Sequence, residues 1–206
     1  VSIPVCAAGR LDPELGEELL RHGKLDFIGM ARRLIADPEL PNKVATGRLE
    51  DIAPCAGCGY CSASRTGDNA LKCRINVAVG KEREYEIKPA EKKKKVLIVG
   101  GGPAGMEAAR VAALRGHEVI LYEEEHDLGG SMPLAALVMD FESESILDMV
   151  RYFRTQLTKL RVTVHLKKGM DLSTIEDIKP DVVILATGGL SALLEMPGIN
   201  HRKVLT

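Results

Sequence analysis

The hydrophobic positions of the first 50 residues form two short apolar runs, each followed by a segment with an amphipathic helical pattern. Strands are predicted over residues 3–8 and 26–30, and helices over residues 13–22 and 38–46. Asp12 is expected to cap the first helix, with Pro13 at its first position and Gly23 after its end. Asp37 is expected to cap the second helix. The predicted order is therefore strand, helix, strand, helix.

From residue 95 onward, apolar runs alternate with longer helical periods. Strands are predicted over residues 96–99, 118–122, 162–166 and 182–186, and helices over residues 103–114 and 145–160. Ser145 and Asp148 have the spacing of a box-like cap at the start of the second helix. The continuous apolar run 96–99 is typical of a strand covered on both faces of a parallel sheet. We therefore expect an α/β unit over residues 95–206.

Residues 51–94 show no strong periodicity and are interpreted as a cysteine-bearing loop and a charged linker. The run Lys92–Lys95 could form a nucleic-acid or membrane patch. The glutamates around it and the neutral chain favour a solvated linker instead. The predicted organisation is thus 1–50, 51–94 and 95–206.

Composition narrows the class of protein. An apolar fraction of 45% supports a packed core and excludes wholesale disorder. Twenty-eight basic against 29 acidic residues leave no electrostatic footprint for nucleic acid. No apolar run approaches the roughly 18 residues needed to cross a bilayer, and no signal peptide is visible. A cytoplasmic protein without a nucleic-acid or membrane partner is expected.

Four of the five cysteines have the spacing C-x2-C-x2-C-x11-C and are the strongest chemical signal: Cys55, Cys58, Cys61 and Cys73. Three thiols within seven residues and a fourth nearby favour a [4Fe–4S] cluster, with Gly57 and Gly59 letting the backbone curl around it. Zinc accepts four thiolates equally well, but it usually uses two separated pairs. Structural thiols without a ligand are the remaining alternative. Cys6 is expected to be a small buried residue.

A dinucleotide fingerprint, G-x-G-x-x-G, lies between a predicted strand and helix as Gly100, Gly102 and Gly105. These glycines permit the tight turn, the approach of a pyrophosphate and close packing of helix on strand. The pyrophosphate is expected on the helix N-terminus, beside Ala104. Glu123 ends the next strand, where an acid can bond a ribose hydroxyl. A glycine-rich turn without a ligand is the alternative.

Two further small-residue openings favour a long dinucleotide. One contains Gly129 and Gly130, and the other contains Thr187 and Gly188. In both, the backbone can approach a second part of the ligand. No catalytic residue is assigned, and no Ser-His-Asp or metal-hydrolase pattern is legible.

With these motifs, the chain resembles the iron–sulfur flavoenzymes related to 2,4-dienoyl-CoA reductase, 2-enoate reductase and trimethylamine dehydrogenase. The resemblance implies that residues 1–50 are the last βα units of an FMN-binding TIM barrel of the old yellow enzyme type. It implies FMN-phosphate contacts at Gly9, Arg10, Ala31 and Arg32, although the family usually has glycine where Ala31 stands. It also implies a [4Fe–4S] cluster on the four cysteines and a Rossmann-like domain for FAD or ADP. Because six barrel strands and an NAD(P)H domain are not represented, the chain is expected to be an internal piece of such an enzyme, or part of a split assembly.

The resemblance further implies an oxidoreductase of small molecules. In it NAD(P)H reduces FAD, the cluster relays electrons, and FMN passes a hydride to an activated C=C bond of an enoate or enoyl-CoA. The two-residue spacing Gly59-Tyr60 is closer to the amine dehydrogenases, in which electrons run outward, and Glu124 departs from a commonly basic position. A non-catalytic electron-transfer module and a zinc-stabilised nucleotide-binding module are the alternatives from other classes. The missing parts of the same enzyme, or further copies of the chain, are the expected protein partners.

Overall fold

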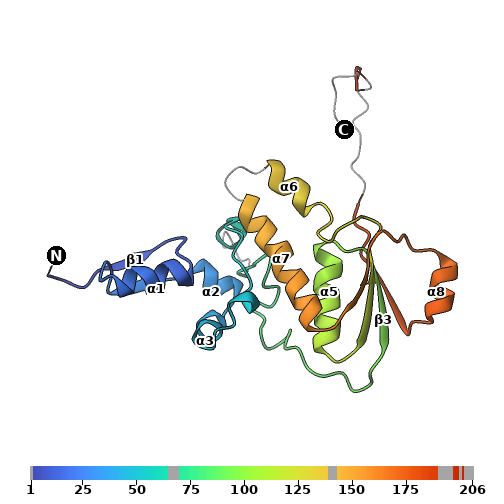
Figure 1. Cartoon of the computed structure of the whole chain (residues 1–206), viewed down its shortest axis with the longest axis horizontal. Helices are drawn as coiled ribbons and strands as arrows, with labels where there is room; N and C mark the ends of the chain where they lie inside the picture. The colour runs from blue at the N-terminus through green and yellow to red at the C-terminus, as the bar shows by residue number, and fades with distance from the viewer. Residues whose placement is uncertain (1, 65–69, 139–142, 190–196, 200, 202–206) are drawn as a thin grey trace.

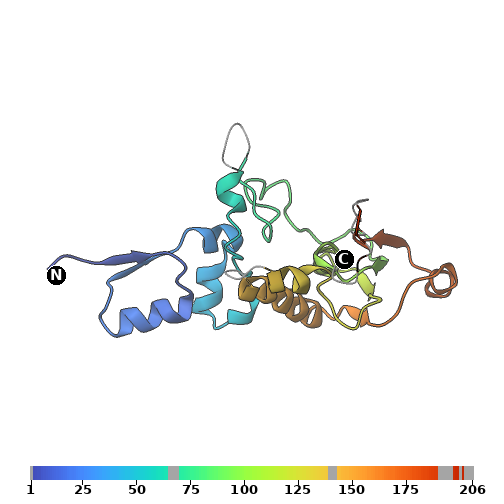
Figure 2. The ribbon, with the colours of Figure 1, turned by 90° about the horizontal axis from the view of Figure 1, so that it is seen from above.

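The computed structural model describes residues 2–64, 70–138, 143–189, 197–199 and 201. The chain is elongated, with an N-terminal arm at one end and a twisted sheet with its helices at the other (Figure 1). The cysteine region lies between the two, as a second view shows (Figure 2). Within the described ranges, no helix is long and apolar enough to cross a membrane.

The N-terminal arm contains two short parallel strands, β1 (Cys6–Ala8) and β2 (Phe27–Gly29), with Cys6 opposite Phe27. Helix α1 (Pro13–Arg21) connects them. The predicted cap is confirmed, since the Leu15 N–H donates to Asp12 Oδ1 at 2.7 Å. Both strands are shorter than predicted. Cys6 is exposed and not buried as expected, because no described element other than β2 pairs with β1.

The prediction for residues 38–46 is wrong at its start. A short helix, α2 (Arg32–Ala36), comes first, and α3 (Leu40–Ala45) has Glu39 at its N-cap position. Asp37 ends α2 and lies buried between the two helices. Its carboxylate has partners beyond the next helix, which a pattern of local spacing does not reveal.

The middle of the chain contains little regular structure. A 3-10 turn, η1 (Leu49–Asp51), precedes the cysteines, and the one-turn helix α4 (Tyr60–Ala63) lies among them. The loop is nevertheless attached to the rest of the chain. Asn76 Nδ2 donates to the Ile35 carbonyl at 2.8 Å, and Gln156 Nε2 donates to Asp51 Oδ1 at 2.9 Å.

The C-terminal region is built on a parallel sheet in the order β5-β4-β3-β6, which confirms the predicted parallel α/β unit. Its strands are β3 (Lys95–Val99), β4 (Glu118–Tyr122), β5 (Thr163–His165) and β6 (Val182–Leu185). The long helices are α5 (Pro103–Leu114) and α7 (Ser143–Lys159), and the short ones are α6 (Met132–Val138) and α8 (Leu172–Ile178). Ser145 lies inside α7, so its predicted capping role is wrong.

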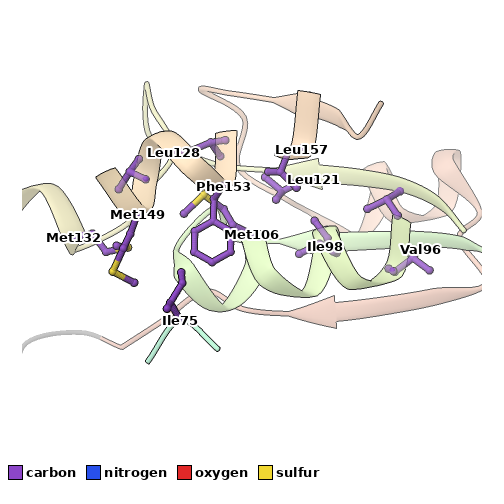
Figure 3. Packing of buried hydrophobic residues seen from close by; sticks show 14 of the residues in the cluster. Ile75, Val96, Ile98, Met106, Leu121, Leu128, Met132, Met149, Phe153 and Leu157 are labelled. Atoms are coloured by element: carbon purple, nitrogen blue, oxygen red, sulfur yellow. The ribbon is translucent and has the colours of Figure 1, made fainter. Parts of the chain in front are cut away.

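The core lies between one face of this sheet and helices α5 and α7 (Figure 3). Met106, Leu121, Phe153 and Leu157 are almost fully buried there. Ile75, which follows the last cysteine of the motif by two residues, packs into the same cluster. The cysteine loop and the sheet therefore share one hydrophobic core. The opposite face of edge strand β6 is open, with Leu185 75% exposed.

Candidate functional site

The four cysteines of the motif line one pocket. Cys55, Cys58 and Cys61 come from the first part of the loop and Cys73 from its far end. All four are free thiols, and each is at least partly accessible. The structure thus brings together the donor set that the spacing predicted.

Two glycines give the loop its curled shape. Gly57 and Gly59, on either side of Cys58, have φ angles of 68° and 67°. Such left-handed angles suit glycine, because side chains with a Cβ are strained there. The chain then turns directly into α4, which carries Cys61 on its first turn. The predicted role of these glycines in curving the backbone is confirmed.

Among the described residues, no three His, Cys, Asp or Glu side chains form a group suited to a single metal ion. With Zn–S bonds of about 2.3 Å, a zinc ion needs its sulfurs to converge on one point. The donor chemistry of four thiols fits a [4Fe–4S] cluster, which takes one sulfur ligand for each iron, and it also fits a zinc ion.

The pocket wall is cationic. Arg32 and Arg74 line it together with the cysteines, and no Asp or Glu does so among the described residues. The Arg10 guanidinium lies against Gly57, so close that a Cβ there would be 2.7 Å from Nη2. Three arginines from distant positions therefore gather around the cysteine loop.

The predicted FMN-phosphate residues lie at one end of the small sheet. Gly9-Arg10 follows β1 and Ala31-Arg32 follows β2. Because the two strands are parallel, both segments leave the sheet at its carboxyl end. Gly9 has a φ of 151°, which favours glycine. Ala31 is the N-cap position of α2, and Arg32 begins that helix. The side chains of both arginines reach the cysteine loop, since Arg10 lies beside Gly57 and Arg32 lines the pocket.

The start of the cysteine loop is fixed by a buried carboxylate. Asp37, only 3% exposed, accepts from the Ala53 N–H at 2.8 Å and from Lys43 Nζ at 2.6 Å through Oδ2. Its Oδ1 accepts from the Glu39 N–H at 3.0 Å. Ala53 stands two residues before Cys55. The ion pair therefore anchors the backbone that leads into the pocket.

The glycine fingerprint lies at the carboxyl end of the parallel sheet, between β3 and α5. This is where ligands bind in open α/β sheets, next to the point at which strand order reverses. Gly100 has a φ of 107°, and a Cβ on it would collide with the Ala186 carbonyl. A Cβ on Gly105 would collide with the Gly100 carbonyl. Gly100 thus has the backbone conformation of the predicted tight turn, and Gly105 allows the predicted close packing of helix on strand.

Gly102 is different. A Cβ placed on it would meet nothing nearer than Gly130 Cα, 3.9 Å away. Its φ of −71° imposes no demand for glycine. The space beside it opens onto the N-terminus of α5, where the first-turn N–H groups, Ala104 and Gly105 included, have no partner within the helix. Among the described residues, no side chain fills this space, and a pyrophosphate fits its chemistry.

Glu123 lies at the end of β4 beside the glycine loop, but its carboxylate is turned inward. Oε2 accepts from the Gly101 N–H at 2.5 Å and Oε1 from the Glu125 N–H at 2.9 Å. The side chain is 7% exposed. The predicted ribose contact therefore has to share this carboxylate with two backbone donors.

The two additional openings converge on the same loop. Gly129 donates its N–H to the Gly101 carbonyl at 2.9 Å, and Gly130 lies against Gly102. Thr187 and Gly188 follow β6, and a Cβ added to Gly188 would have no described atom within 4 Å. All predicted dinucleotide segments thus lie at the carboxyl end of the parallel sheet.

Sequence patterns did not identify several residues that shape these sites. Arg154 on α7 donates to the Leu128 carbonyl at 3.0 Å and pairs with Asp127, which fixes the loop before Gly129. Arg74 stacks on the Tyr60 ring across the cysteine loop. Their partners are 14 to 27 residues away in the sequence, and no short motif links them.

The chain is similar to known oxidoreductases. The sequence model of the pyridine nucleotide-disulphide oxidoreductase family matches residues 94–206. The chain is 40% identical to a cinnamate reductase of Clostridium sporogenes over 97% of its own length and 30% of the relative's. It is also 40% identical to an N,N-dimethylglycine/sarcosine dehydrogenase of Chromohalobacter salexigens, over 96% of the chain and 29% of that relative.

Among solved structures, a 2-naphthoyl-CoA reductase in complex with 2-naphthoyl-CoA has the same fold with a TM-score of 0.92. The two are 38% identical over 98% of this chain and 31% of that structure's chain. The chain thus spans about 30% of the length of the relatives it matches. These relatives include both reductases and amine dehydrogenases.

Proposed function

Because this chain belongs to the iron–sulfur flavoenzyme family of 2,4-dienoyl-CoA reductase, 2-enoate reductase and trimethylamine dehydrogenase, we propose that it serves an NAD(P)H-dependent reduction of an activated C=C bond. The substrate class is an enoate or an enoyl-CoA thioester. The cinnamate and 2-naphthoyl-CoA reductases support this class by their names. Residues 1–50 contribute to an FMN site, residues 51–94 hold the cluster, and residues 95–206 bind FAD or ADP.

One observation supports the proposal above all others. The four thiols surround a single pocket that lies between the two arginine-bearing strand ends and the core of the nucleotide-binding fold. Cys55, Cys58, Cys61 and Cys73 would each supply one sulfur ligand to a [4Fe–4S] cluster. Such a cluster, when bound, accepts and donates one electron at a time. Ile75 and Met149, both in the hydrophobic core, line the pocket with apolar side chains.

The dinucleotide would lie along the carboxyl edge of the sheet. Gly102 leaves room for its pyrophosphate, the start of α5 donates N–H groups to it, and Glu123 is within reach of the ribose. Gly129, Gly130, Thr187 and Gly188 allow the rest of the ligand to approach the backbone. At the other end, Arg10 and Arg32 carry the positive charge that an FMN phosphate needs.

The test is anaerobic purification with iron, acid-labile sulfide and flavin quantified in one sample. About four irons and four sulfides per chain are expected. A Cys73→Ser variant should lose most of this iron, and Cys6→Ser, a cysteine outside the pocket, should keep it. Stoichiometric zinc without iron in the unmodified protein would instead indicate the zinc-stabilised module. A cluster with nucleotide but no turnover of any enoate would indicate the electron-transfer module.

Amine oxidation is the second candidate. The spacing C-x2-C-x2-C and the N,N-dimethylglycine/sarcosine dehydrogenase relative favour it. In that direction the substrate supplies electrons, and an external acceptor removes them. Assays of a dimethylated amine with an artificial acceptor, run beside cinnamate with NADH, separate the two candidates.

A further inference from the structure

An arginine and a tyrosine bridge the two ends of the cysteine loop. The Arg74 guanidinium carbon lies 5.0 Å from the centre of the Tyr60 ring. Tyr60 stands between Cys58 and Cys61, and Arg74 follows Cys73 directly. The contact therefore joins the segment with three thiols to the segment with the fourth. Both residues also line the pocket itself.

The bridge brings a permanent charge to the pocket. A guanidinium stays protonated at every accessible pH, and its planar shape stacks on an aromatic face. No carboxylate lines the pocket among the described residues, and Arg32 is the other charged side chain there. The field at the pocket is therefore positive. Arg32 has a separate assignment at the strand end, whereas Arg74 has none.

We propose that Arg74, held in place by the Tyr60 ring, is a positioning and tuning residue for the iron–sulfur cluster. Net charge and the groups around the sulfurs set the reduction potential of such clusters. Reduction adds one negative charge, which a nearby cation stabilises, so Arg74 raises the potential. The stacking contact also holds Cys73 close to the other three ligands. This inference rests on the proposed cluster.

The experiment compares four variants of the protein purified anaerobically. Arg74→Gln removes the charge, Arg74→Lys keeps it, and Tyr60→Leu removes the ring. Arg83→Gln, an exposed arginine of the connector that does not line the pocket, is the matched control. Two quantities are measured: the cluster's reduction potential by EPR-monitored titration, and the rate at which a ferrous chelator removes its iron.

Arg74→Gln is expected to make one-electron reduction about tenfold less favourable, a fall of about 59 mV in potential. Arg74→Lys and Arg83→Gln should keep the potential within a fraction of that shift. Tyr60→Leu should release iron several-fold faster than the control. A native potential in Arg74→Gln overturns the tuning role. If that variant holds no cluster, a native rate of iron release in Tyr60→Leu overturns the proposal.

The proposed function fails separately from this inference. If the unmodified protein binds no iron and sulfide, the cluster assignment itself is wrong before any variant is compared. If it binds the cluster and the variants behave as the control does, the function stands and the role of Arg74 is refuted.

Discussion

The backbone N–H of Gly101 donates a 2.5 Å hydrogen bond to Oε2 of Glu123, which joins the turn after β3 to the end of β4. The two residues are 22 positions apart in the sequence. The buried carboxylate also accepts from the Glu125 N–H. Glu123 therefore shapes the glycine loop in addition to its predicted contact with a ribose.

Replacing Glu123 by Gln should reduce stability without any ligand present. An amide has one acceptor oxygen where the carboxylate has two, so one buried N–H loses its partner. The expected cost is about 1–3 kcal/mol in the free energy of unfolding. Urea denaturation of the nucleotide-free protein measures it. Glu124→Gln, at the exposed neighbouring position, should change stability little. If the two variants are equally stable, Glu123 does not stabilise the ligand-free fold, and its role is confined to contact with a ligand.

Alanine substitutions at Gly101 and Gly102 should affect different properties, the first the stability of the protein and the second its affinity for a nucleotide. A Cβ on Gly101 would be 2.5 Å from Leu128 Cδ2 and 2.8 Å from Glu123 Oε2, whereas one on Gly102 would meet no described atom nearer than Gly130 Cα, 3.9 Å away. Gly101→Ala is expected to cost about 1–3 kcal/mol in stability. Gly102→Ala should keep the stability of the nucleotide-free protein and weaken binding of ADP or FAD, measured calorimetrically. Unchanged affinity in Gly102→Ala would place the pyrophosphate elsewhere.

Asp37→Asn should destabilise the start of the cysteine loop. The substitution leaves the half-buried Lys43 ammonium without its counter-ion and weakens the bond to the Ala53 N–H. A loss of about 3 kcal/mol is expected. Asp12→Asn is the control, because asparagine caps a helix as well as aspartate does. If both variants unfold at the native urea concentration, the ion pair carries no net stability.

Acid should weaken the attachment of η1 to α7. Hydrogen bonds with Lys159 lower the pKa values of both Glu50 and Asp51 below their ordinary range. A carboxylate whose pKa is lower in the folded state stabilises the protein above its unfolded pKa, and this contribution is lost as the pH falls through the folded value. The stability curve should therefore fall below about pH 4. Lys159→Met should flatten this part of the curve, while Lys24→Met, at an exposed loop position, should leave it unchanged.

Sequence patterns predicted the features that depend on neighbouring residues. Asp12 caps α1 because its acceptor and the Leu15 N–H are three residues apart, which is a local signal. The strand, glycine turn and helix at Gly100–Gly105 follow the same logic. Helices α6 and α8, of seven residues each, are too short for periodicity to reveal.

Features that depend on tertiary contact were not predictable in this way. Asp37 has the residue type and position of a helix cap. Its partner Ala53 lies 16 residues further along the chain, so Asp37 anchors the start of the cysteine loop instead. The Arg74–Tyr60 contact spans an interval that no motif describes. Clustering of the thiols was predicted because their spacing is short, whereas the cationic wall around them required the fold.

The position of Ile75 in the common core would link binding of the proposed cluster to folding. Ile75, two residues after Cys73, is buried in the cluster that contains Met106, Met149 and Phe153 (Figure 3). Any ligand that binds the folded loop and not the unfolded chain raises the free energy of unfolding through mass action. Because the loop and the sheet bury their side chains together, this gain extends to the nucleotide-binding region. Calorimetry of the loaded and unloaded protein should record it as a shift of one common transition.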